Sequence, residues 1–192
     1  MRKIVLASKS PRRKSLLKQI GINFAVDVSE VDEKKFSHSN PVNLAKALSF
    51  AKAKIISKKH KNALIIGADT VVVLNREIIG KPKSLKDARE ILEKLSRKTH
   101  VVITGLTVLD TKTKKHITSA VKTKVKFKNL TKEEVNWYVK TGEPMDKAGG
   151  YGIQDKGAVL VESVSGDYSN IVGLPIHKLL ENLKKFEVDI AS

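Results

Sequence analysis

Residues 63–74 read ALIIGADTVVVL. Two apolar runs, Ala63–Ile66 and Val71–Leu74, have the composition of buried β-strands and flank Gly67-Ala68-Asp69-Thr70. We therefore place the Asp69 carboxylate at a strand end, where α/β proteins usually bind their ligands. An unpaired charge there would be costly, so Asp69 needs a cationic or metal partner. The competing interpretation is an Asp that caps a local turn at the glycine.

Strands and helices are expected to alternate on either side of this segment. The other expected strands are Lys3–Ala7, Phe24–Val28, His100–Leu109, Ala120–Lys128 and Ala158–Val161. The expected helices begin at capping or proline positions, which are Ser10-Pro11, Asn40-Pro41, Ser84, Thr131 and Pro175. Repeats, low-complexity linkers and clean domain boundaries are absent from the sequence. The pattern predicts an α/β fold, with a mixed twisted sheet flanked by helices, in a single domain over residues 1–192.

The net charge and the amino-acid composition bear on whether the protein binds nucleic acid or a membrane. The 192 residues carry a formal charge of +17, which suggests a basic nucleic-acid-binding protein without hydrolase activity. However, only 6 of the 37 basic residues are Arg, and aromatic residues make up 5%, which is few for base stacking. A lysine-coated surface without specific nucleic-acid binding is therefore the favoured interpretation. The chain has no Cys and no apolar run long enough for a membrane span, so we expect a cytoplasmic protein.

The segment Ser8-Lys9-Ser10-Pro11-Arg12-Arg13 has the features of an anion site. It lies where the first strand ends and the first helix begins, so backbone N–H groups and the helix dipole favour negative charge there. Ser8, Arg12 and Arg13 add hydroxyl and guanidinium donors. The alternative is a capped helix start whose basic residues are merely solvated.

Further candidates lie in turns and glycine-rich loops. Lys81, in Ile79-Gly80-Lys81-Pro82, could reach a phosphate, but the sequence contains no Walker motif and Lys81 is not a P-loop lysine. The five His residues lack metal-ligand spacing. Lys147–Gln154 and Gly166–Asn170 are predicted to be loops, and their glycines allow other groups to approach the backbone closely. These features favour a phosphate-containing ligand without specifying a reaction.

Together these segments resemble the Maf family of nucleotide pyrophosphatases. The matching segments, in family order, are Leu6–Arg13, Ser29–Glu33, Lys52–Lys54, Gly67–Val72, Gly80–Pro82, Thr104–Val108, Glu143–Gln154 and Gly166–Pro175. They cover the chain nearly end to end, and the ordered set is far more specific than any one segment. One departure is Ser15, where many members carry an acid after the paired Arg.

The resemblance implies a Maf/ITPase-like fold with two lobes around a central cleft that holds the active site. It also implies cleavage of a nucleoside triphosphate between its α and β phosphates, with a divalent metal cation, Mg²⁺ or Mn²⁺, as cofactor. Asp69 would be the general base and a ligand of the metal, and Glu33 would help to hold the metal or the water. The residues that would grip the phosphates are Ser8, Arg12, Arg13, Lys52 and Lys81. A homodimer and the absence of a membrane partner are further expectations.

Three positions resemble the subgroup that acts on dTTP and UTP: Arg12 after Pro11, Thr70 after Asp69, and Gln154 at the end of the glycine loop. The Gln154 amide offers a donor beside an acceptor, which complements N3–H and O4 of uracil and thymine. A flipped amide would pair with cytosine as well. The alternative is the subgroup that acts on 7-methyl-GTP, whose cationic base would favour an acidic partner instead.

Overall fold

A computed structural model describes residues 2–28, 30–36 and 40–188. The chain divides into two compact units: unit 1 comprises residues 1–69, 104–121 and 173–192, and unit 2 comprises residues 70–103 and 122–172. The two compact units correspond to the two lobes that the resemblance implies. The central cleft and the single domain over residues 1–192 stay predictions. Within the described ranges, every helix is too short or too polar to cross a membrane.

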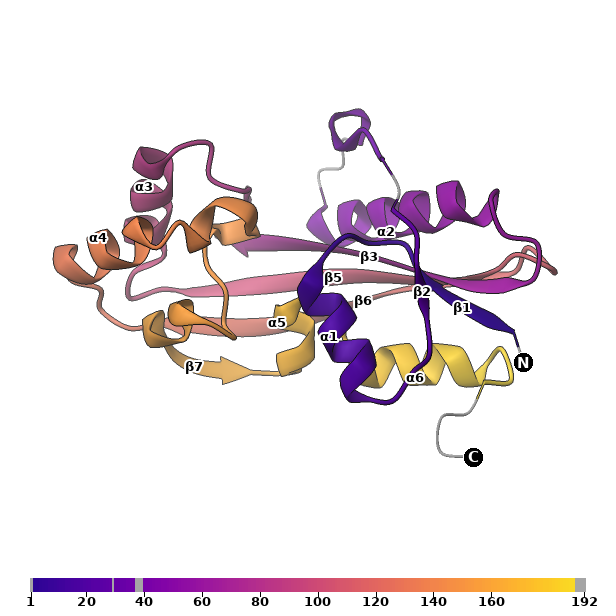
Figure 1. Ribbon diagram of the computed structural model, residues 1–192. Helices are drawn as coiled ribbons and strands as arrows, with labels where there is room; N and C mark the ends of the chain where they lie inside the picture. The colour runs from indigo at the N-terminus through magenta and orange to yellow at the C-terminus, as the bar shows by residue number, and fades with distance from the viewer. Residues whose placement is uncertain (1, 29, 37–39, 189–192) are drawn as a thin grey trace. The chain divides into compact units, whose positions relative to one another are not determined.

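Strands and helices alternate along the first part of the chain, and pairs of consecutive strands or helices interrupt the alternation later (Figure 1). The strands are β1 (Lys3–Leu6), β2 (Ala25–Val26), β3 (Ala63–Leu74), β4 (Glu77–Ile79), β5 (Thr99–Asp110), β6 (His116–Phe127) and β7 (Val161–Ser165). The α-helices are α1 (Pro11–Gln19), α2 (Pro41–Ser57), α3 (Leu85–Leu95), α4 (Lys132–Lys140), α5 (Tyr168–Val172) and α6 (Ile176–Lys184). The 3-10 helices are η1 (Glu33–Lys35), η2 (Glu143–Asp146), η3 (Ala148–Gly150) and η4 (Lys156–Leu160).

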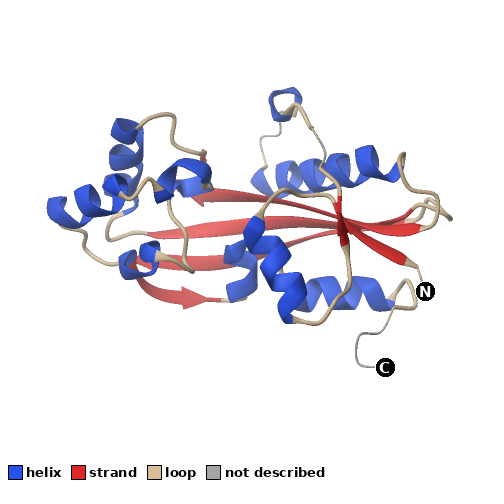
Figure 2. Ribbon diagram, in the orientation of Figure 1, coloured by secondary structure: helices blue, strands red, loops and turns tan. Residues whose placement is uncertain are grey.

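The strands form a seven-stranded sheet in the order β2-β1-β3-β5-β6-β7, with β4 paired to β3 (Figure 2). β1 runs parallel to β2 and β3, and Val5 lies opposite both Ala25 and Ile65. The β3–β4 and β6–β7 pairs are antiparallel. The sheet is therefore mixed and flanked by helices, which confirms the predicted fold class.

In unit 1, α2 lies very close to the sheet. A Cβ atom built on Gly67 of β3 would lie 2.2 Å from the Ser49 carbonyl oxygen, and one on Gly105 of β5 would lie 2.1 Å from the Ala45 carbonyl oxygen. Only glycine permits this approach of helix backbone to strand. α2 covers one face of these strands and α6 covers the other (Figure 1). The glycines thereby set the distance between the side chains of α2 and those of β3.

In unit 2, helices α3 and α4 pack together around an apolar core that includes the buried Phe127 and Tyr138. His100 is buried in the same core, with its ring edge-to-face against Phe127 and Tyr151 at centroid distances of 5.0 and 5.3 Å. Its Nε2 lies 2.7 Å from the Tyr151 hydroxyl. Burial lowers the pKa of His100 to about 4, because the charged imidazolium would lose its hydration.

The four predicted N-caps, Ser10, Asn40, Ser84 and Thr131, are confirmed, since each side chain accepts a hydrogen bond from a backbone N–H in the first turn. At Thr131 the capping box is complete. Pro175 precedes α6 as expected.

Three local predictions were wrong. β3 runs without a break through residues 67–70, so Asp69 lies inside a strand, because Gly67 provides room for α2 instead of a turn. The expected strand over Ala158–Val161 is mostly η4, and β7 begins only at Val161, since so short an apolar run does not distinguish helix from strand. Phe24–Val28 shortens to the two residues of β2.

Candidate functional site

Asp69 is a buried carboxylate that pairs with a lysine of α2. It is 7% exposed, and its place two residues after Gly67 directs the side chain to the same face as Gly67, toward the helix. The Lys52 Nζ donates a hydrogen bond of 2.5 Å to Asp69 Oδ1. The same ammonium donates one of 2.9 Å to Glu33 Oε1, so one cation bridges two acids.

The electrostatics of this pair leave Asp69 a weaker acid than usual. Burial raises the pKa of the Asp69 carboxyl, whereas the charge and hydrogen bond of Lys52 and the charge of Arg13 lower it, and burial prevails. The negative charge of Glu33 adds to the rise. A carboxylate with a raised pKa is a stronger proton acceptor, which is the property required of a general base.

Arg13 is held at the start of α1 by three defined contacts. Its Nε donates to the Gly173 carbonyl oxygen at 2.7 Å, its Nη1 donates to Ser8 Oγ at 3.1 Å, and its backbone N–H donates to Ser10 Oγ at 3.5 Å. Burial lowers the pKa of Arg13 and the charge of Asp69 opposes that change, but a guanidinium stays protonated throughout. Arg13 is therefore a permanently charged donor of fixed orientation, and its charge interacts with that of Asp69.

Five predicted residues therefore belong to one group, which we term the Asp69 cluster: Ser8, Arg13, Glu33, Lys52 and Asp69. All of them belong to unit 1. Ser8 and Arg13 lie at the end of β1 and the start of α1, Glu33 lies on η1, Lys52 on α2 and Asp69 on β3. Two acids, two cations and a hydroxyl in one group can bind an anion and accept a proton at the same place.

The other predicted residues are placed separately. Arg12 follows Pro11 on α1, half-buried, and its charge contributes to lowering the pKa of Arg13. Thr70 follows Asp69 on β3 and, by strand alternation, faces the opposite side of the sheet. Lys81, after β4, and Gln154, between η3 and η4, are exposed residues of unit 2. Of the predicted motif residues, Ser29 lies outside the described residues.

Several contributors were missed at the level of sequence. Gly67 and Gly105 set the distance from α2 to the sheet, and the Gly173 carbonyl fixes Arg13. Tyr138 and Glu143 hold the glycine loop that carries Gln154. Isolated glycines inside apolar strand patterns are a signal of close backbone approach, so Gly67 and Gly105 were detectable in principle.

The donor set suits a divalent cation that is shared with a phosphate ligand. Asp69 Oδ1 and Glu33 Oε1 both lie within hydrogen-bond distance of the Lys52 ammonium. The described part of the chain contains no group of three or more His, Cys, Asp or Glu side chains able to form an all-protein metal site. Mg²⁺ commonly uses one or two carboxylates and completes its coordination with phosphate oxygens and water, so the pair fits that mode.

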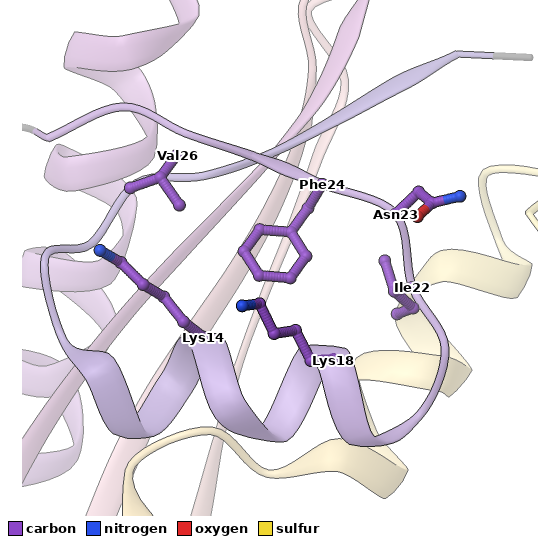
Figure 3. Close-up of a pocket in the computed structure, with 6 residues that line it drawn as sticks. All are labelled: Lys14, Lys18, Ile22, Asn23, Phe24 and Val26. Carbon is purple, nitrogen blue, oxygen red and sulfur yellow. The ribbon is translucent and has the colours of Figure 1, made fainter.

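A surface hollow lies beside α1. It is lined by Lys14, Lys18, Ile22, Asn23, Phe24 and Val26, and Figure 3 shows both lysines extending beside the Phe24 ring. None of these six residues belongs to the Asp69 cluster.

Comparison with known proteins agrees with the motif pattern. The family model for Maf-like protein matches residues 3–186. A dTTP/UTP pyrophosphatase of Dictyoglomus turgidum is 52% identical over 97% of this chain and 97% of its own, and one of Symbiobacterium thermophilum is 44% identical over 97% and 95%. A solved structure of a HAM1 protein from Coxiella burnetii shares 15% identity over 83% of this chain and 92% of that chain, with a TM-score of 0.46. That structural likeness is too weak to support an inference.

Proposed function

Because the chain belongs to the family of Maf-like proteins, we propose that it is a nucleoside triphosphate pyrophosphatase that hydrolyses dTTP and UTP to the monophosphate and pyrophosphate. The observation that carries this proposal is the Asp69 cluster, in which a buried carboxylate of raised pKa lies beside oriented cations. The names of relatives up to 52% identical over nearly the full chain support the same activity.

In the proposed reaction a water oxygen attacks the α-phosphorus. Asp69 accepts the proton of this water, the bond from the α-phosphorus to the bridging oxygen breaks, and pyrophosphate leaves with the bonding electron pair. Lys52 holds Asp69 in place through the 2.5 Å hydrogen bond.

The phosphates would be bound by the cationic and hydroxyl donors. Arg13 and Ser8 lie at the N-terminal end of α1, where the helix dipole also favours an anion. Arg12 and Lys81 complete the proposed set. Donors fixed before the substrate arrives stabilise charge that develops on the leaving group most effectively, and Arg13 meets that condition through its contact with Gly173.

A divalent cation, Mg²⁺ or Mn²⁺, is the proposed cofactor, with Asp69 and Glu33 as its protein ligands. When bound, it would neutralise phosphate charge and polarise the reacting phosphorus. We also propose a cytoplasmic location and a homodimer.

Base recognition is assigned to Gln154, with Thr70 and Arg12 as the other subgroup positions. The exposed Gln154 amide can pair with N3–H and O4 of uracil or thymine. The alternative substrate, 7-methyl-GTP, carries a cationic base, which a neutral amide would not favour.

The test is pyrophosphate release from dTTP, UTP, CTP, GTP and 7-methyl-GTP with Mg²⁺ or Mn²⁺, repeated with Gln154→Glu. We expect dTTP and UTP to react fastest. A preference for 7-methyl-GTP would refute the base assignment alone, whereas no release from any nucleotide would refute the pyrophosphatase itself.

A second candidate, a basic nucleic-acid-binding protein without hydrolase activity, is favoured only by the charge of +17. It predicts binding to DNA or RNA that falls steeply with salt, together with no pyrophosphate release. The same preparation can be used for both measurements, so the two candidates are separated directly.

A further inference from the structure

The segment Gly152–Gly157 of unit 2 is held at its first residue by the Tyr138 side chain and at its last two residues by the Glu143 side chain. At its first residue, the backbone N–H of Gly152 donates to the Tyr138 hydroxyl oxygen at 3.1 Å. At its last two residues, the N–H of Lys156 donates to Glu143 Oε2 at 3.2 Å and the N–H of Gly157 donates to Glu143 Oε1 at 3.3 Å. The segment is therefore a turn closed by side chains outside it.

The two holding side chains are themselves coupled. The Tyr138 hydroxyl donates to Glu143 Oε1 at 2.8 Å, so a continuous chain of hydrogen bonds runs from one end of the turn to the other. Tyr138 is fully buried on α4, where its ring packs in the unit 2 core. The Lys147 ammonium donates to the Glu143 carbonyl oxygen at 2.7 Å and fixes the backbone from which the carboxylate extends. A buried aromatic ring and a fixed carboxylate make a rigid support.

The two glycines at the ends of the turn make room for this support. A Cβ atom on Gly157 would lie 2.7 Å from the Tyr138 hydroxyl and 2.4 Å from the Gly152 carbonyl oxygen. A Cβ atom on Gly152 would lie 3.2 Å from Glu143 Oε1 and 2.7 Å from the Lys147 side chain. Gly157 therefore needs to be glycine because of the close approach of the Gly152 backbone, and a larger residue there would push the turn away from Tyr138. At Gly152 a larger residue would displace the Lys147 side chain, which supports Glu143.

Gln154 lies between these two ends. It is exposed, whereas Gly152 and Gly157 are buried, so the turn presents its amide to solvent from an anchored base. A terminal amide reads a base edge only when its backbone is held to within a fraction of an ångström, because its own side-chain bonds rotate.

We infer that Tyr138 and Glu143 are positioning residues for base discrimination, which act by holding both ends of the turn that carries Gln154. This inference rests on the proposed role of Gln154. Neither residue need touch the nucleotide, and their effect is expected in the preference among bases and not in the handling of phosphates.

The experiment compares kcat/KM for UTP and CTP in the unmodified protein and in Tyr138→Phe, Glu143→Gln and Gln154→Ala. Tyr138→Phe keeps the buried ring and removes the hydroxyl that accepts from Gly152. Glu143→Gln keeps one acceptor oxygen and removes the partner of one turn N–H. Tyr151→Phe is the matched control, because it also removes a buried tyrosine hydroxyl. The hydroxyl of Tyr151 contacts His100 and not the turn. Amide hydrogen exchange of residues 152, 156 and 157 provides a readout that is independent of the reaction.

The expected result is a drop in the UTP-to-CTP ratio on the order of tenfold in Tyr138→Phe and Glu143→Gln, with faster exchange at the turn amides and an unchanged ratio in Tyr151→Phe. An equal drop in Tyr151→Phe would show a general loss of stability and overturn the inference. The inference would also be overturned if Gln154→Ala lowered the UTP-to-CTP ratio while Tyr138→Phe and Glu143→Gln left it unchanged. If Gln154→Ala leaves the ratio unchanged, the proposed base-reading role fails first and the inference fails with it. Should Tyr138→Phe not fold, Glu143→Gln, which retains an oxygen for Tyr138, decides the question.

Discussion

Substitution of Gly67 by Ala tests whether the close approach of α2 to β3 positions the Asp69 cluster. The added Cβ would lie 2.2 Å from the Ser49 carbonyl oxygen and 3.0 Å from the Ala53 Cβ, whereas ordinary contact begins at 3.4 Å. The helix must therefore retreat by roughly 1 Å. Overpacking of this kind costs about 1–3 kcal/mol of unfolding free energy.

The same retreat acts on the reaction through Lys52. Its Nζ lies 2.5 Å from Asp69 Oδ1, and a shift of about 1 Å would lengthen this contact to the limit of a hydrogen bond. We expect kcat to fall on the order of 10²-fold, because a displacement of this size at a catalytic group has that effect. The assay pairs pyrophosphate release with urea unfolding followed by circular dichroism.

Gly80→Ala is the control for the loss of a glycine, since a Cβ there meets nothing within 4 Å, and its unfolding free energy should stay within about 0.5 kcal/mol of that of the unmodified protein. If Gly67→Ala lost stability but kept its rate, the flexible Lys52 side chain would have absorbed the shift. The reasoning that the strand glycine sets the catalytic geometry would then be refuted.

Three further predictions follow from the site and the unit 2 core. Asp69→Asn should retain nucleotide binding but lose on the order of 10²-fold or more in turnover, because the amide cannot accept the proton; near-normal turnover would remove Asp69 from the role of base. Arg13→Ala should raise KM or lower kcat for every triphosphate alike, and a change confined to base preference would contradict its phosphate role. His100 should destabilise the fold as the pH falls. Its folded pKa of about 4 lies below the usual 6.5, so the unfolded chain takes up the proton first, and up to about 3 kcal/mol of stability is lost between these values. His100→Gln should flatten that part of the profile in urea titrations from pH 7 to 4, and an unchanged slope would show that another group is responsible.

Local sequence was sufficient for the features that depend on neighbouring residues. Ser10 and Pro11 predicted the start of α1, and Thr131 predicted the start of α4, where it forms a capping box with Glu134, because a cap is a contact between residues three apart. The strand expected over Ala120–Lys128 likewise corresponds to β6, which pairs with β7 in an antiparallel arrangement. Asp69 stood out because a charge between two apolar runs requires a partner.

The identity of that partner was beyond any local pattern. Lys52 is 17 residues from Asp69 in sequence, and their contact exists because α2 lies against β3 at Gly67. The same glycine misled the local interpretation, since a glycine in a strand allows close packing as readily as it allows a turn. Tyr138 and Glu143 were overlooked for a related reason. In the sequence, Tyr138 has the spacing of a core residue and Glu143 is an acid in a loop. Only their hydrogen bonds to the backbone of residues 152–157 show which segment they hold. Caps and strand alternation depend on interactions within a few residues and are visible in sequence, whereas the pairing of a buried charge depends on how distant elements pack.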